Sequence, residues 1–168
     1  MIAAIAATLV AVLIAPAVAS AADRVIRSRA SLVTSVGPLK PTDTGVTRLT
    51  TLFGRATAVV PRGNGCVVRF SRAHITVTLA NFGGGDACDA GRAQSARVDG
   101  REWRTQRGLR VGDRVSRIKR LYSRARFRRG RWELQAAPLF GLSVVTLDAS
   151  VTDGRVRRIQ AYLGGAGE

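Results

Sequence analysis

Two segments of the chain carry apolar side chains at helical spacing. In each segment these side chains fall at i, i+3, i+6 and i+7, which places them in one stripe along a helix. The two stripes are Val46, Leu49, Leu52 and Phe53, and Val115, Ile118, Leu121 and Tyr122. We predict one helix that is capped by Thr42 or Thr44 and stops at Gly54, and a second helix with Asp113 as its candidate cap.

Segments with strand patterns follow both predicted helices. Residues 65–71 and 74–80 are rich in β-branched residues, and the second segment alternates apolar with polar or small side chains, the period of a half-buried strand. Residues 131–138 predict another strand, and residues 141–163 predict two strands on either side of Asp153-Gly154, a common tight-turn dipeptide. The remaining segments are less regular: residues 30–37 fit a short helix or an extended lead-in, 82–94 a glycine-rich loop, and 95–103 a short strand or a turn.

The two predicted helices are related by an offset of 69 residues. At this offset Val46 falls on Val115 and Phe53 on Tyr122, and in both halves strands follow the helix. We predict an α+β fold built from two tandem helix-plus-antiparallel-sheet repeats, residues 22–100 and 101–168, that close into one compact domain. Coincidence remains the alternative, because any two amphipathic helices can be aligned in this way.

The first 22 residues contain no charged side chain. An apolar run from Ile2 to Ala15 ends at Pro16, and Ala19-Ser20-Ala21 fits a small-residue cleavage site. We predict a signal peptide at residues 1–21 and a secreted or cell-envelope-associated bacterial protein. A retained anchor is the alternative, so membrane contact is expected only through an uncleaved leader.

The two cysteines fit this export prediction. Cys66 and Cys88 are the only cysteines, and an even pair in an oxidising compartment usually forms a bridge. We therefore predict a Cys66–Cys88 disulfide. Two thiols and a single histidine, His74, do not supply the ligand set of a metal site.

The repeated pattern resembles the tandem fold of the β-lactamase inhibitor proteins, and single copies of a similar unit occur in small outer-membrane lipoproteins of the BamE type. The segments that carry the resemblance are VGPLKPTDTGVTRLTTLFG and RGLRVGDRVSRIKRLYS, and the pattern covers most of residues 31–163. The resemblance implies that the sheets of both halves form a concave face able to hold a protein partner. No position matches a contact motif of the inhibitors, so no contact residue is carried over.

The chain is also similar to uncharacterised secreted proteins of actinobacteria. They share a W-x-T-x-x-GLRVGD segment, here Trp103 to Asp113, and a final AGE. This second resemblance implies no function.

Nine basic and no acidic side chains occupy residues 114–132, within a chain of 168 residues and formal net charge +16. Lys40 and Lys119 are the only lysines, so 25 of the 27 basic residues are arginine, which also fits a compositional bias. On the predicted helix the arginines fall opposite the apolar stripe, which is typical of a solvated face. Beyond the helix they flank Phe127 and Trp132, an arrangement that can hold a polyanion. The candidate polyanion contacts are Arg114, Arg117, Arg120, Arg124, Arg126, Arg128, Arg129 and Arg131.

Catalytic and cofactor motifs are weak. His74 could act as a base, but no motif places a nucleophile beside it, and we interpret it as a turn or partly buried residue. Asp86 and Asp89 lack the ligand spacing of an EF-hand and are expected to cap turns near the bridge. Trp103 and Trp132 are expected in the core or at the seam between halves. We predict no catalytic residue, no cofactor and no metal.

Three function classes follow from these observations. The first is a secreted non-catalytic binding module with a protein or cell-envelope partner on its sheet face. The alternative is an arginine-rich envelope protein held electrostatically on anionic cell-wall polymer or lipid, and the third class is an enzyme of unknown type. Specific nucleic-acid recognition is not expected, because no known nucleic-acid module is present.

Overall fold

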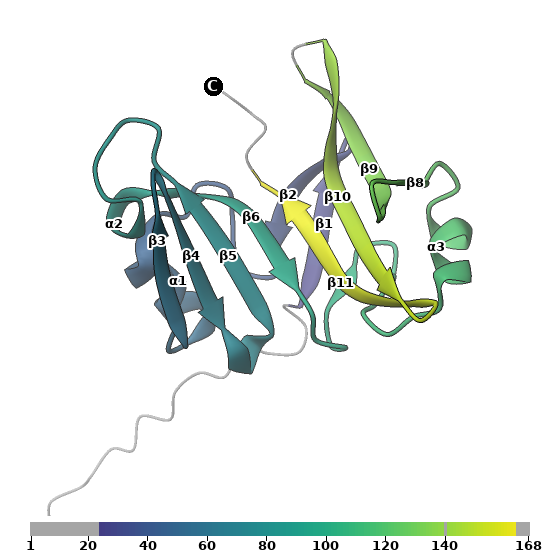
Figure 1. Cartoon of the computed structure of the whole chain (residues 1–168), viewed down its shortest axis with the longest axis horizontal. Helices are drawn as coiled ribbons and strands as arrows, with labels where there is room; N and C mark the ends of the chain where they lie inside the picture. The colour runs from purple at the N-terminus through teal and green to yellow at the C-terminus, as the bar shows by residue number, and fades with distance from the viewer. Residues whose placement is uncertain (1–23, 140, 164–168) are drawn as a thin grey trace, which may run out of the picture.

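An eight-stranded antiparallel sheet dominates the computed structural model, which describes residues 24–139 and 141–163 (Figure 1). The strand order is β3-β4-β5-β6-β11-β10-β9-β8, so the two ends of the sheet come from the two ends of the sequence. We call β3–β6 the N-terminal half-sheet and β8–β11 the C-terminal half-sheet; they meet where β6 pairs with β11. The strands are β3 (Ala58–Arg62), β4 (Gly65–Phe70), β5 (Ile75–Ala80), β6 (Arg92–Val98), β8 (Arg126–Arg128), β9 (Arg131–Leu139), β10 (Leu142–Thr152) and β11 (Arg155–Tyr162).

A second layer covers one face of this sheet. It contains a three-stranded sheet of order β2-β1-β7 and three α-helices, and β2 packs against β10 and β11. In Figure 1 this layer lies largely behind the eight strands, with α3 at the side of the C-terminal half-sheet. Its elements are β1 (Val25–Arg29), β2 (Leu32–Val36), α1 (Gly45–Phe53), α2 (Ala87–Ala90), β7 (Arg104–Thr105) and α3 (Val115–Leu121). The described residues therefore form a mixed α+β fold.

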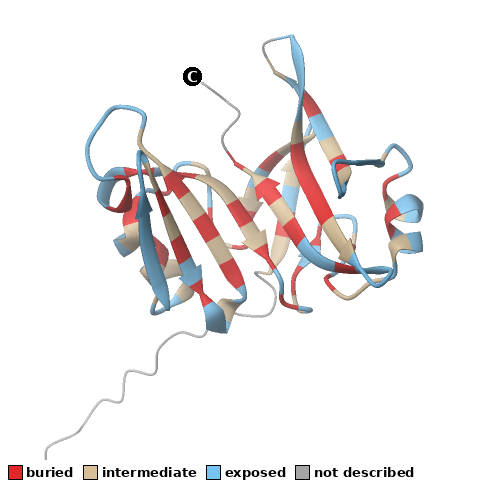
Figure 2. Cartoon of the chain, viewed as in Figure 1, coloured by how far each residue is buried: buried red, intermediate tan, exposed pale blue. Residues whose placement is uncertain are grey.

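The core lies between the two layers. Along β5, Ile75, Val77 and Leu79 are buried while Thr76 and Thr78 are half-buried, so only one face of the strand points into the core (Figure 2). The buried side chains from both half-sheets form one continuous cluster. The alternation predicted for residues 74–80 is thus confirmed, and it separates a buried face from an open face of the sheet.

The two tryptophans differ in burial. Trp103 is 1 % exposed, and its Nε1–H donates to the Ala73 carbonyl oxygen at 2.7 Å. Trp132 is half-buried and packs against the core, with the Lys119 ammonium 5.8 Å from its ring centre. The prediction that both tryptophans lie in the core is therefore confirmed for Trp103, whereas Trp132 lies at the edge of the core.

The stripe prediction for both helices is confirmed, and α1 ends at Gly54 as predicted, but the predicted side-chain capping bonds at the two N-termini are not formed. Thr44 and Arg114 occupy the N-cap positions, and neither side chain accepts a capping hydrogen bond. Asp113 instead closes the turn before α3, where it accepts from the Arg110 N–H at 2.8 Å. Asp43 does the same before α1, accepting from the Lys40 N–H at 2.8 Å.

Backbone carbonyls, in place of threonine and aspartate side chains, accept the hydrogen bonds of the first helical amides. The first amide of each helix donates to the carbonyl that precedes the last strand of its half-sheet, and that strand donates back to the aspartate carbonyl. The bonds are Gly45 N to Gly91 O (3.0 Å), Ala93 N to Asp43 O (3.1 Å), Val115 N to Gly154 O (2.9 Å) and Val156 N to Asp113 O (2.8 Å). Side-chain caps are not needed where tertiary contacts already satisfy the first helical amides.

Candidate functional site

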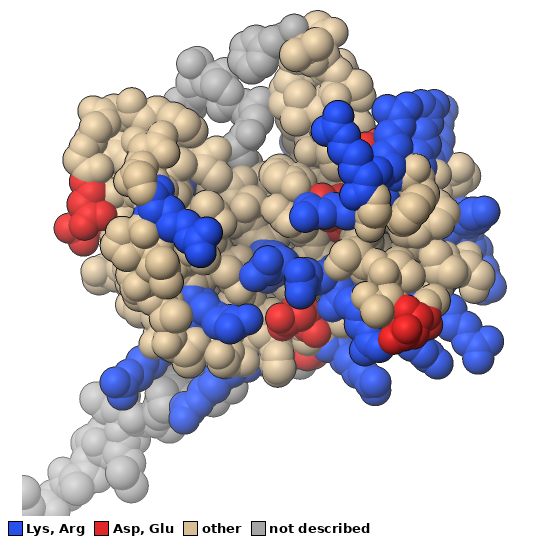
Figure 3. All heavy atoms as spheres, viewed as in Figure 1, with Lys and Arg blue, Asp and Glu red and all other residues tan. Residues whose placement is uncertain are grey.

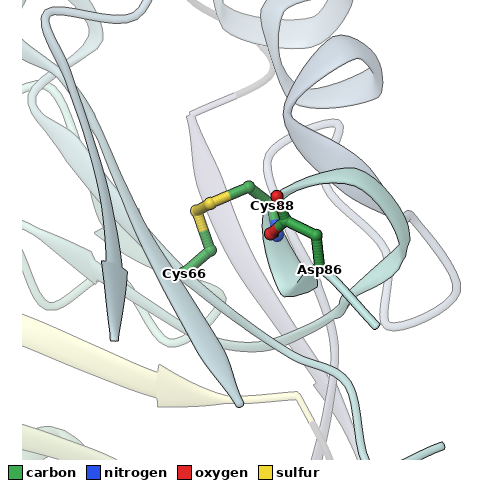
Figure 4. The surroundings of a disulfide bond; sticks show 3 residues. All are labelled: Cys66, Asp86 and Cys88. Carbon is green, nitrogen blue, oxygen red and sulfur yellow. A yellow bond between two sulfur atoms is a disulfide. The ribbon is translucent and has the colours of Figure 1, made fainter. Parts of the chain in front are cut away.

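The predicted disulfide joins the sheet to the helix layer. Cys66 on β4 and Cys88 on α2 are bonded, with their Cα atoms 5.1 Å apart (Figure 4). Asp86 accepts from the Cys88 N–H at 2.7 Å, which confirms the turn-capping role expected for Asp86. A disulfide indicates an oxidising, extracytoplasmic location. The predicted signal peptide, residues 1–21, lies outside the described residues, and none of the helices in the described ranges is long and apolar enough to cross a membrane.

A row of polar side chains crosses the open face of the eight-stranded sheet. The strand register places six residues side by side, one from each of six neighbouring strands. From β4 to β9 they are Arg69, Thr76, Arg97, Gln160, Asp148 and Glu133. A second row, Val67, Thr78, Ser95 and Tyr162, lies beside it. We call these two rows, with Arg62, Arg131 and Arg158, the open face.

Hydrogen bonds and charges organise the middle of the open face. The Arg131 guanidinium lies 3.5 Å from the Asp148 carboxylate and donates to Gln160 at 3.4 Å. The Tyr162 hydroxyl donates to Asp148 at 3.2 Å. Burial raises the pKa of Asp148, and Arg131 offsets part of this rise. Burial and the neighbouring Asp148 raise the pKa of Tyr162.

Arginines from both half-sheets gather around Arg97. Burial lowers the pKa of Arg97, and the positive charges of Arg158, Arg69 and Arg131 lower it further, against the opposing effect of Asp99. A hollow of about 240 Å³ lies beside Arg97 over the threonines of β5. Figure 3 shows basic side chains in a band across this face, and they are densest over the C-terminal half-sheet. The open face is thus a broad, polar and positively charged surface.

The arginines of residues 114–131 do not form one surface. Arg117 and Arg120 are exposed on α3, which confirms the solvated helix face, and Arg117 pairs with Asp113 at 3.3 Å. Arg114 is exposed at the helix N-cap, and Arg129 lies in the β8–β9 turn with φ 49°. Arg131 reaches the open face. Five of the eight arginines predicted to contact a polyanion therefore lie on different parts of the surface.

The other three, Arg124, Arg126 and Arg128, line a pocket of about 560 Å³ where α3 ends. The pocket is also lined by residues of β9 and β10 and by Ser31 in the β1–β2 turn. We call it the α3 pocket; the residues that matter below are Tyr122, Arg107, Arg124, Arg126, Arg128 and Gln135. Arg107 was not predicted, because it lies in the loop between β7 and α3, outside the arginine-rich stretch, and carries no local signal for this site.

His74 occupies a left-handed turn before β5, with φ 51°. Its Nδ1 lies 3.5 Å from Asp99, and both side chains are about half exposed, at 54 % and 46 %. Ser71 lines the same small hollow, but its hydroxyl is hydrogen-bonded to Thr57 Oγ1 at 2.9 Å. The turn position expected for His74 is confirmed. Within the described residues no group of three or more histidine, cysteine or acidic side chains could hold a metal ion.

Comparison of the chain with protein families, curated proteins and solved structures found no significant match. The resemblance to the tandem β-lactamase inhibitor fold and to BamE-type units therefore stays a prediction, and the function has to be argued from the open face and the α3 pocket.

Proposed function

We propose that this protein is an exported, non-catalytic binding module that holds the acidic surface of a protein partner on its open face. The observation that carries the proposal is the polar row across six strands, with four arginines, Arg69, Arg97, Arg131 and Arg158, around its centre. The described second layer covers the other face of the sheet, so this one is available to a partner.

The size of the open face fits a protein better than a small ligand. Its seven strands, β3 to β9, spaced about 4.8 Å apart span roughly 29 Å, and six residues along a strand add roughly 20 Å. The product, roughly 580 Å², is of the same order as the ~800 Å² that each partner contributes to a standard protein–protein interface. The hollow beside Arg97, about 240 Å³, is smaller than the usual volume of a small-molecule site. Arginine and tyrosine are also the residue types enriched where interfaces are strongest.

We also propose that the chain is a tandem duplication of one helix-and-sheet unit, residues 22–100 and 101–168. Each helix follows an aspartate turn and uses the same pair of backbone hydrogen bonds to the last strand of its half-sheet. Arg97 on β6 pairs with Gln160 on β11, and the flanking pairs are symmetric about them. These features support a local two-fold relation at the β6–β11 seam, and a concave partner-binding face of the kind that the inhibitor resemblance implies.

The experiment is capture from the source organism's envelope and extracellular proteins on the immobilised mature chain at two salt concentrations. We expect the wild type to retain one protein partner, more weakly at the higher salt concentration because part of the interface is ionic. The variant Arg97→Ala/Arg158→Ala should lose this partner, whereas Arg117→Ala/Arg120→Ala removes the same charge from α3 and should keep it. Equal loss in both variants, or loss in neither, would contradict an interface on the open face.

A second candidate function is electrostatic retention on anionic cell-wall polymer or lipid. The observation that favours it is the set of arginines that line the α3 pocket, Arg124, Arg126 and Arg128. Binding of this kind weakens steeply as salt rises, because the ions screen exposed charges. Retention on isolated cell-wall material at low salt, lost at high salt, would favour this function over a protein partner.

A further inference from the structure

The α3 pocket is separate from the proposed protein-binding surface. Its lining includes Tyr122 from the C-terminal end of α3, Leu134 from the core side of β9, and Ser31 from the β1–β2 turn. Glu133 is the one residue that belongs both to the open face and to this lining. At about 560 Å³ the pocket is in the size range of small-molecule sites. Its occupancy can therefore be tested independently of the proposed function.

Polar side chains line the pocket beside the arginines. Ser31, Ser123 and Ser143 lie there together with Gln135. Tyr122 lines the pocket too, but its hydroxyl is buried beside the Thr105 hydroxyl and is not exposed to the pocket. Burial raises the pKa of Tyr122, while the Thr105 hydroxyl and Arg107 offset part of the rise. The serines therefore offer hydroxyl groups, which both donate and accept hydrogen bonds, to a ligand that carries hydroxyls of its own.

Arg107 is held in place for such a ligand. Its Nη1–H donates to the Leu121 carbonyl oxygen at 3.1 Å, and its guanidinium lies 5.2 Å from the centre of the Tyr122 ring. The first contact satisfies a carbonyl at the C-terminal end of α3 and reduces the negative potential there. The remaining guanidinium donors stay available, because arginine has five N–H groups.

The charge around the pocket is strongly unbalanced. Four arginines line it, Arg107, Arg124, Arg126 and Arg128, against a single carboxylate, Glu133. None of the ion pairs between described residues involves Arg107, Arg124, Arg126 or Arg128. Converging arginines without carboxylate partners are the usual setting for a phosphate, whose oxygens accept two N–H bonds from one guanidinium.

We propose that the α3 pocket binds a phosphate ester that also carries free hydroxyl groups, the chemistry shared by a polyol phosphate, a sugar phosphate and a segment of a polyol-phosphate polymer. The arginines bind the phosphate. Ser31, Ser123 and Ser143 line the same pocket and offer hydrogen bonds to the hydroxyl groups of the ligand.

The test is calorimetric titration of the mature chain with glycerol 3-phosphate, the smallest probe with both chemical features. We expect a dissociation constant of about 1 mM or below, weaker binding of inorganic phosphate by about fivefold or more, and no binding of glycerol. Absence of binding up to about 10 mM glycerol 3-phosphate would overturn the proposal, as would inorganic phosphate binding equally well.

Matched variants separate the pocket from the general positive charge of the protein. Arg124→Gln/Arg126→Gln should weaken glycerol 3-phosphate binding by about tenfold or more, because two charged hydrogen-bond donors are lost. Arg117→Gln/Arg120→Gln removes the same charge from the exposed side of α3 and should change the affinity by less than about twofold. Equal losses in the two pairs would mean unspecific attraction and would overturn the site.

The Ser123→Ala/Ser143→Ala variant tests the hydroxyl recognition. It should weaken glycerol 3-phosphate binding by about fivefold and leave inorganic phosphate binding unchanged, which a change in the general positive charge of the protein would not produce. Amide chemical shifts of the wild type keep the site testable even if a variant misfolds. Glycerol 3-phosphate should shift the signals of Ser123, Gln135 and Ser143 and leave those of Thr76 and Arg97 unchanged; shifts confined to the open face would overturn the assignment.

A parallel titration with poly(glycerol phosphate) distinguishes the two sources of the ligand. Per phosphate group, affinity about tenfold above that of glycerol 3-phosphate would identify a polymer segment, and equal affinity would identify a free polyol or sugar phosphate. In both cases the Arg124→Gln/Arg126→Gln variant must lose binding, and polymer binding that this variant retains would overturn the pocket as its site.

Discussion

The two half-sheets share an order of elements but differ in how they are closed. In the N-terminal half-sheet a disulfide ties β4 to α2, and α1 packs so closely on α2 that a Cβ atom on Gly45 would collide with the Asp89 carbonyl. In the C-terminal half-sheet α3 leaves a pocket of about 560 Å³ lined by arginines. The comparison teaches that the N-terminal half-sheet is built for rigidity, whereas the C-terminal half-sheet retains space and charge for recognition.

Removal of the disulfide should have the largest effect. The bridge closes a loop of 22 residues, so Cys66→Ala/Cys88→Ala should lower the free energy of unfolding by about 3 kcal/mol in urea denaturation. Hydrogen exchange should rise more in β4 and β5 than in β9 and β10, because the constraint acts on the N-terminal half-sheet. Reduced wild-type protein is the control and should show the same loss. An equal rise in exchange across both half-sheets would break the comparison.

The aspartate turns provide the next test, because both half-sheets contain one. Asp43 is 9 % exposed and also pairs with Arg48 at 2.8 Å, whereas the Asp113 side chain is 18 % exposed. We expect Asp43→Ala to cost about 2–3 kcal/mol and Asp113→Ala about 1–2 kcal/mol, since a more buried amide loses its acceptor at Asp43. Thermal and urea denaturation measure both losses.

Asp153→Asn is the control for this pair of variants. Asp153 is exposed and has φ 52°, a left-handed conformation that asparagine tolerates as aspartate does, and its contact with Arg157 is a surface ion pair, so the change should cost less than about 0.5 kcal/mol. A larger loss at Asp113 than at Asp43 would show that the C-terminal half-sheet depends more on its turn than the N-terminal one does.

Local patterns were sufficient to predict helices α1 and α3, the disulfide and the alternating strands. The stripes at Leu49 and Ile118 lie on helices that bury both side chains completely. Strand β3 was missed because residues 58–62 are exposed throughout and contain Pro61, so they show no burial alternation. Residues 82–94, predicted as a loop, contain α2 and the start of β6. Residues 30–37, for which a short helix and an extended segment were both open, contain strand β2. The pairing of β2 with β1 could not be predicted from such short segments.

The sites were less predictable than the elements, because their residues meet only in the folded chain. The density of arginine near residue 126 pointed to three residues of the α3 pocket, but Arg107 and Gln135 join them from other elements. The open face was missed as a charged surface, although the polar positions of β5 marked that face as uncovered. Only the strand register brings Arg97 beside Gln160.

Two tyrosines sharpen the contrast between the α3 pocket and the open face. The Tyr162 hydroxyl donates to Asp148 at 3.2 Å, so Tyr162→Phe should lower the free energy of unfolding by about 1 kcal/mol. The Tyr122 hydroxyl is buried beside the Thr105 hydroxyl without a hydrogen bond of ordinary geometry, so Tyr122→Phe should leave the stability unchanged or raise it by about 0.5 kcal/mol. Paired denaturation curves measure the difference. A clear loss for Tyr122→Phe would mean that its hydroxyl is hydrogen-bonded to Thr105.

The smallest effect concerns the pH dependence of Asp148 on the open face. Burial raises the pKa of this carboxyl in the folded protein, so the folded state holds the proton more tightly than the unfolded state does. The resulting penalty is absent below the ordinary aspartate pKa and develops as pH rises through that value toward the folded one. Asp148→Asn does not titrate, so its stability relative to the wild type should increase between about pH 3 and pH 7. Arg131 reduces the effect by stabilising the carboxylate, and Arg131→Gln in the wild-type background should therefore enlarge it. Denaturation midpoints at the two pH values measure both changes, and a relative stability that falls with pH would show that Arg131 and Tyr162 outweigh burial at this site.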